Sequence, residues 1–119
     1  MIAELPTGIA ECAPIRAWFA AGSPCTSIYV PAFPCSVAGP PPFVPAELSA
    51  GELWHAADAL RQLVEDDPAA LAGIREVLGP IEDELWAEAD GVLGQHDRWA
   101  AVGAAWGRRA LHAVRSCIP

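Results

Sequence analysis

The sequence predicts an α+β fold in which two to three short N-terminal strands are followed by three helices. Nine of the twelve prolines lie in residues 1–46, and proline excludes long helices there because it lacks a backbone N–H. From residue 49 onward, apolar residues recur at three- and four-residue steps, which is typical of amphipathic helices. We therefore divide the chain into a strand and loop region, 1–46, with a proline-rich linker from residue 38, and a helical region, 47–119.

Two β-type runs occur in the first region, IRAWFAA at 15–21 and TSIYVPAF at 26–33. In the second run Ile28 and Val30 face one way and the residue between them faces the other, which is the alternation of a strand. The sequence Gly-Ser-Pro at 22–24 is typical of a turn. These features predict a hairpin or a pair of neighbouring strands.

Three helices are expected in the second region, at about 49–66, 68–93 and 97–116. The first begins at Ser49, whose hydroxyl forms a capping box with Glu52 three residues later. Its apolar stripe consists of Leu53, Ala56, Leu60, Leu63 and Val64. The helical region therefore has a clear start in the sequence.

The second helix is expected to begin at Asp67-Pro68, with the carboxylate as cap and proline at the first helical position. Gly79-Pro80 interrupts its middle, but the apolar stripe keeps its phase, which predicts a kink near residue 80 within one helix. That stripe consists of Leu71, Ile74, Leu78, Ile81, Leu85 and Val92. The third helix carries its apolar face on Trp99, Val102, Trp106, Ala110 and Ala113.

The charge balance limits the kinds of partner. The chain of 119 residues has 15 acidic residues against 7 arginines and no lysine, a net charge of -8, which argues against a nucleic-acid backbone as partner. No apolar run approaches the length of a membrane span. The N-terminal sequence carries Glu4 and Glu11 where a signal peptide carries basic residues. We therefore expect a cytoplasmic protein with no nucleic-acid or membrane partner.

The cysteines do not form a metal-binding pattern. Cys12, Cys25, Cys35 and Cys117 include no C-x-x-C pair, so we expect no metal site, and no other cofactor is indicated. Two disulfides are arithmetically possible. A reducing compartment favours free, buried thiols instead.

Cys25 is the residue for which catalysis has to be considered. A catalytic thiol needs a nearby base or a helix N-terminus that lowers its pKa. Each of His55, His96 and His112 lies in helical sequence with a surface or helix-end role of its own. We therefore expect Cys25 to be a packed or site-lining thiol, and whether the chain is an enzyme stays open.

Two further features have both a functional and a structural interpretation. The acidic runs at 65–67 and 82–84 could hold a cation, but we expect solvated helix surface in both. The five tryptophans could form an aromatic ligand cage, although such residues more often anchor a core or an interface. We favour the structural interpretation for both features.

Three stretches, MIAELP, IRAWFAAGSPCTSIYVPAFP and GELWHAADALRQLVEDDPAALAGIREVLGPIEDELWAEA, resemble the C-terminal part of the secernin and cysteine-dipeptidase family of N-terminal-nucleophile hydrolases. The resemblance covers about residues 1–90. The residues that carry it are Trp18, Gly22, Ser23, Pro24, Cys25, Thr26, Ser27, Pro31 and Phe33, followed by Leu53-Trp54, Asp67-Pro68 and Leu85-Trp86. It implies part of a four-layer αββα fold, and catalysis by a cysteine at the mature N-terminus whose own α-amino group serves as base.

By this resemblance the four cysteines all match late parts of the family, and no residue of the chain occupies the nucleophile position. The chain is then the C-terminal part of a secernin-like dipeptidase or amidohydrolase, inactive without the missing N-terminal portion. Its loop would flank the site of a peptide-like small substrate through Ser23, Cys25, Thr26 and Ser27. The alternative is a non-catalytic helical module that forms a homo-oligomer through the stripe of the second helix.

Overall fold

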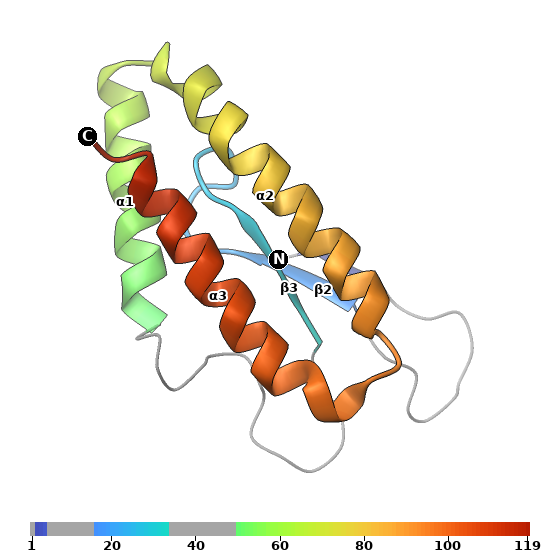
Figure 1. Cartoon of the computed structure of the whole chain (residues 1–119). Coiled ribbons are helices and arrows are strands. Elements are labelled where there is room, and N and C mark those ends of the chain that lie inside the picture. Colours follow the sequence, from blue (N-terminus) through green and yellow to red (C-terminus); the bar gives the residue numbers. More distant parts are fainter. Residues whose placement is uncertain (1, 5–15, 34–49) are drawn as a thin grey trace.

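The computed structural model describes residues 2–4, 16–33 and 50–119. The expected linker from residue 38, the cap at Ser49, and Cys12 and Cys35 lie outside these residues. The elements in chain order are the strands β1 (Ile2–Glu4), β2 (Arg16–Ala20) and β3 (Tyr29–Ala32), the helices α1 (Ala50–Asp66) and α2 (Ala70–Val92), the short 3-10 helix η1 (His96–Arg98) and the helix α3 (Trp99–Ser116). The expected α+β class, with short strands before three helices, is confirmed (Figure 1).

The strands form one antiparallel sheet in the order β1-β2-β3. The predicted hairpin is confirmed, because β2 pairs with β3 in a register that places Ala20 opposite Tyr29. The strand β3, Tyr29–Ala32, is shorter than the run expected at 26–33. The backbone N–H of Thr26 donates to the carbonyl of Ser23 at 3.2 Å, so the residues before Tyr29 belong to a turn.

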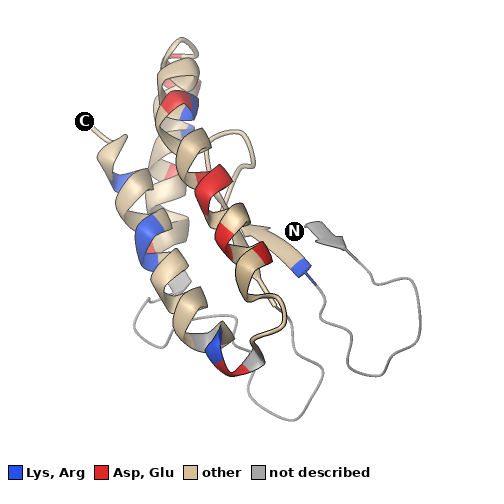
Figure 2. Ribbon diagram, turned by 45° about the vertical axis from the view of Figure 1, so that its right-hand side comes forward, with Lys and Arg blue, Asp and Glu red and all other residues tan. Residues whose placement is uncertain are grey.

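The three helices form one layer beside the sheet, with α3 packed against both α1 and α2 (Figure 1). The strand β3 lies directly against α2 and α3, and β2 lies between β3 and β1 in the sheet. The acidic residues of α2 and the basic residues of α3 lie on neighbouring helices (Figure 2). The ring of Phe33, just after β3, stacks on that of Trp99 with centroids 4.6 Å apart. The core lies between the hairpin and all three helices.

The apolar stripes predicted from the sequence supply this core. Each helix places at least one stripe residue in it with almost no exposed surface, namely Leu60, Leu78, Leu85, Trp106 and Ala110. At about 25 cal/mol per Å² of apolar surface removed from water, burial of this kind is the main term that holds the layers together. Each helix buries the apolar face that the sequence predicts, so the expected amphipathic helices are confirmed.

The second helix begins two residues later than expected. The carboxylate of Asp67 accepts a hydrogen bond from the N–H of Ala69 at 3.1 Å, and the N–H of Ala70 donates to the carbonyl of Asp67 at 3.0 Å. Asp67 therefore caps a tight turn that leads into α2 and does not cap the helix itself. Pro80 lies inside α2, which continues to Val92 as a single helix.

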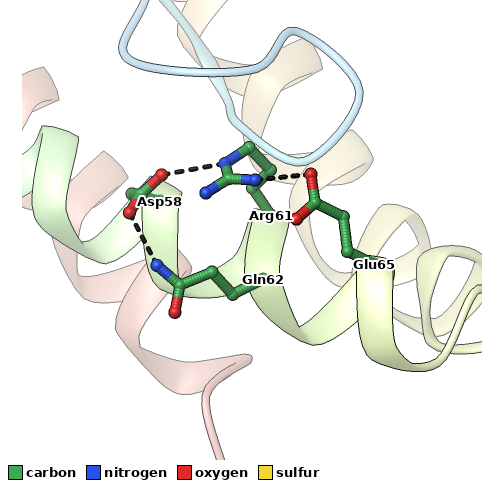
Figure 3. Close-up of polar contacts among 4 residues, drawn as sticks. All are labelled: Asp58, Arg61, Gln62 and Glu65. Carbon is green, nitrogen blue, oxygen red and sulfur yellow. Dashed lines mark hydrogen bonds and ion pairs between the residues drawn. The ribbon is translucent and has the colours of Figure 1, made fainter.

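A network of polar side chains lies along the surface of α1. On α1, Arg61 donates to Asp58 at 2.9 Å and also pairs with Glu65, while the amide of Gln62 donates to Asp58 at 2.9 Å (Figure 3). The hydrogen bond from Arg61 is the main reason that the pKa of Asp58 lies below its usual value. Because this network is at the surface, we assign it little stability.

Candidate functional site

The loop that the sequence singled out, 22–27, connects β2 to β3 and lies against α1. Gly22 adopts φ of +80°, which side chains rarely tolerate. A Cβ atom at Gly22 would lie 3.4 Å from the Cβ of Ala57 on α1. The loop therefore favours glycine at this position because of its backbone conformation, whereas an added methyl group would make an ordinary contact with Ala57.

Two charged side chains of α2 hold the backbone that follows the loop tip. Arg75 donates from Nη1 to the carbonyl of Ser27 at 2.9 Å, and the carboxylate of Glu82 accepts the N–H of Tyr29 at 2.8 Å. Arg75 Nη2 and Glu82 Oε1 are 3.6 Å apart. We call this arrangement of Arg75, Glu82 and the backbone of Ser27 and Tyr29 the α2 clamp.

The clamp corrects one expectation. The acidic run at 82–84 was expected to be mostly solvated helix surface; Asp83 and Glu84 are exposed, but the side chain of Glu82 is only 12% exposed. Its position could have indicated this, because residue 82 is four after Leu78 and three before Leu85, beside the buried stripe. The run at 65–67 is exposed, as expected.

The four predicted site residues do not all face the same way. Cys25 is exposed and Ser23 is partly exposed, whereas Thr26 and Ser27 are buried, at 3% and 0% exposure. Within the described part of the chain, the hydroxyls of Thr26 and Ser27 have no hydrogen-bond partner. A ligand at the surface of this loop can therefore reach Ser23 and Cys25 but not the two buried hydroxyls, unless the loop moves.

Cys25 is a free thiol at the surface, so the expectation of a buried thiol is wrong for this residue. No hydrogen bond or ion pair joins its sulfur to another described side chain, that is, to one in residues 16–33, 50–95, 97–99 or 101–119. His55 and His112 are exposed, and the ring of His55 lies against that of Trp54 at 5.3 Å. Neither of these two histidines is hydrogen-bonded to Cys25, and the side chain of His96 lies outside the described part of the structure.

The second described cysteine is in a different environment. Cys117 is a free, partly buried thiol just after α3, and its sulfur donates to the carbonyl of Ala113 at 3.5 Å. Burial raises the pKa of this thiol. Because the thiolate is the reactive form, the raised pKa disfavours reaction at this partly buried thiol.

The tryptophans divide into core and surface groups. Trp99 and Trp106 are buried, as expected for core anchors. Trp54 and Trp86 are exposed, and Trp86 lies beside Trp18 with ring centroids 5.6 Å apart. The interpretation as core anchors is confirmed for Trp99 and Trp106, and the pair of Trp18 and Trp86 lies where β2 meets α2.

Among the described residues, no three His, Cys, Asp or Glu side chains gather closely enough to hold a metal ion. None of the helices there is long and apolar enough to cross a bilayer. Comparison of the chain with protein-family models, with curated proteins and with solved structures gives no match.

Proposed function

We propose that this chain is the C-terminal part of a secernin-like dipeptidase or related amidohydrolase. In this proposal the loop 22–27 forms one wall of the substrate site, and a nucleophile from another segment performs the catalysis. The observation that carries the proposal is the α2 clamp, which fixes the backbone beside this loop.

The clamp supports a binding role because a substrate site needs a backbone that is already in place. Hydrogen bonds to charged groups are shorter and stronger than those between neutral groups. Here one such bond holds the carbonyl of Ser27 and another holds the N–H of Tyr29. Side chains supported by a second layer of hydrogen bonds position a ligand more accurately than those of an unsupported loop.

The exposed side of the loop supplies groups suited to a peptide. The hydroxyl of Ser23 can donate and accept a hydrogen bond, which matches the N–H and C=O groups of an amide substrate. Cys25, in the same loop, is a free and exposed thiol. In our proposal these two residues border the substrate, and neither attacks it.

The arrangement of layers is compatible with part of an αββα fold. One helical layer lies beside one antiparallel sheet, and β1 is the outermost strand of the described sheet. A two-layer unit of this kind is half of a four-layer architecture. In our proposal the remaining strands and helices come from the segment that supplies the nucleophile.

The alternative, a helical module that associates through the stripe of α2, needs a correction. Ile74, Leu78 and Leu85 are buried in the core of the chain itself, at 4%, 0% and 0% exposure. The stripe therefore cannot serve as an interface between copies without unfolding the core. Sedimentation of the purified chain tests self-association through any other surface, and a well-defined dimer with cooperative melting would favour the alternative.

The proposal is tested by reconstitution. The coding DNA upstream of Met1 is expected to encode, in frame or as a neighbouring gene, a segment that begins with a cysteine-led strand. Co-expression of that segment with this chain should give hydrolysis of simple dipeptides that survives Cys25→Ser. Glu82→Ala should raise the KM of the reconstituted enzyme, and the neighbouring Asp83→Ala should not. An upstream sequence without such a segment, or a pair without turnover, contradicts the proposal.

A further inference from the structure

A pocket of about 220 Å³ lies between the hairpin and α2, at the end of the hairpin away from the turn. Its lining includes Trp18 and Phe33 from the hairpin and Trp86 from α2, with Arg16 and Asp90 also contributing. An engineered apolar cavity of about 150 Å³ is enough to bind benzene. This pocket therefore has room for one aromatic ring with a short substituent.

Two indole rings make the pocket suited to such a ring. Trp18 and Trp86 have centroids 5.6 Å apart and planes tilted by 57°. Tilted and offset arrangements at this distance are those that aromatic rings favour. Trp86 is 40% exposed, so part of its surface is still in contact with water and can be covered by a ligand.

The pocket also carries one charge of each sign. Arg16 of β2 forms an ion pair with Asp90 of α2, and the two side chains are 30% and 65% exposed. The guanidinium carbon of Arg16 lies 5.9 Å from the ring centroid of Trp18. A ligand whose ring lies against the two tryptophans in the pocket would therefore have its polar end close to both a cation and an anion.

We propose that this pocket binds a free aromatic α-amino acid. The ring would lie against Trp18 and Trp86, the α-carboxylate would face the guanidinium of Arg16, and the α-ammonium would face the carboxylate of Asp90. A zwitterion is complementary to an ion pair because each of its charges meets the opposite one. The carboxylate of Asp90 can accept several hydrogen bonds at once, so its pairing with Arg16 can persist. This site lies away from the loop 22–27 and does not depend on the proposed hydrolase role.

The first test is calorimetric titration of the full chain with L-phenylalanine. We expect saturable one-to-one binding that Trp86→Ala weakens by about tenfold or more. Trp54→Ala is the matched control, because Trp54 is a similarly exposed tryptophan on α1, at 48%, and this variant should bind as the wild type does. Absence of saturable binding, or equal effects of the two variants, overturns the proposal.

The second test separates the two charges of the ligand. N-acetylphenylalanine lacks the ammonium and phenylalanine amide lacks the carboxylate, and each should bind about tenfold more weakly than L-phenylalanine. Asp90→Asn should weaken the binding of L-phenylalanine but should not weaken that of N-acetylphenylalanine, which has no ammonium to pair with Asp90. L-alanine, which has no ring, should not bind. Equal affinity for L-phenylalanine and its two derivatives overturns the assignment of a zwitterion, and thermal melting of each variant confirms that it is folded.

Discussion

The carboxylate of Glu82 accepts a hydrogen bond from the backbone N–H of Tyr29 at 2.8 Å, although the two residues are 53 positions apart. This bond fastens the start of β3 to the middle of α2. With the bond from Arg75 to the carbonyl of Ser27, it explains how a short hairpin keeps a fixed position beside the helices.

Glu82→Ala should therefore destabilise the fold. The substitution leaves the N–H of Tyr29 without its acceptor and removes the partner of Arg75, and loss of a partly buried charged hydrogen bond costs about 2 kcal/mol. Urea denaturation measures the change. Asp83→Ala is the control, because Asp83 is exposed and such surface changes stay within about 0.5 kcal/mol. Equal losses in the two variants would argue that the clamp contributes nothing.

Gly22→Ala should also destabilise the protein, by about 1–2 kcal/mol, because φ of +80° brings a Cβ close to the backbone. The added methyl would also meet Ala57. Gly73→Ala is a matched control within α2, where a Cβ meets nothing within 4 Å, and it should stabilise by about 0.5–1 kcal/mol. The unfolding midpoints of the two variants in urea should thus move in opposite directions. A shift of both midpoints in the same direction would contradict the assigned backbone conformation of the loop.

Ser27→Ala should cost no stability. The hydroxyl is buried without a hydrogen-bond partner in the described part of the chain. On folding, this hydroxyl loses its hydrogen bonds to water and gains none in return, so removal of the hydroxyl is neutral or stabilising. Ile28→Val next to it shows whether the assay is sensitive enough, because loss of one buried methylene costs about 0.5–1.5 kcal/mol. A clear loss of stability in Ser27→Ala would mean that this hydroxyl has a partner in the folded protein.

Glu88 should contribute to the loss of stability in acid. Hydrogen bonds from Arg109 and from the indole of Trp106 lower the pKa of this carboxyl below its usual 4.5. Because its pKa is lower in the folded chain than in the unfolded chain, its contribution is complete above the unfolded value and is lost as the pH falls through the folded value.

Glu88→Gln should therefore make the unfolding midpoint less dependent on pH between about pH 5 and pH 3. The side chain is about half exposed, so we expect a difference below about 1 kcal/mol. Arg109→Ala should reduce the dependence in the same way, since Arg109 is the main cause of the lowered pKa. Identical pH profiles for the wild type and Glu88→Gln would refute this assignment.

The sequence was sufficient for the fold class and for which faces of the helices are buried. Leu78 and Leu85 follow the helical period and are fully buried. Apolar residues repeated every three to four positions lie on one side of a helix, and that side packs against the core. The turn before β3 was also predicted from the sequence, by Gly-Ser-Pro at 22–24. The start of α2 was not, because Asp67 can cap either the helix or the turn that precedes it, and local sequence does not distinguish the two.

The candidate site was less predictable because it depends on contacts between distant residues. That Thr26 and Ser27 point inward while Cys25 points outward follows from how the loop packs on the helices, and the loop sequence itself does not contain this information. The pairing of Trp18 with Trp86 likewise joins β2 to α2. In both cases the residue types were noted from the sequence, and the packing of the hairpin decided their environment.

The central claim is that the loop 22–27 borders a substrate site and that Cys25 is not the nucleophile. The most direct measurement is dipeptide hydrolysis by the purified chain, with Cys25→Ser beside it. Our account predicts no turnover by either protein alone. Turnover by the chain that disappears in Cys25→Ser would identify Cys25 as the nucleophile, and turnover that persists in the variant would place the catalytic residue elsewhere in this chain. Either result would contradict the account.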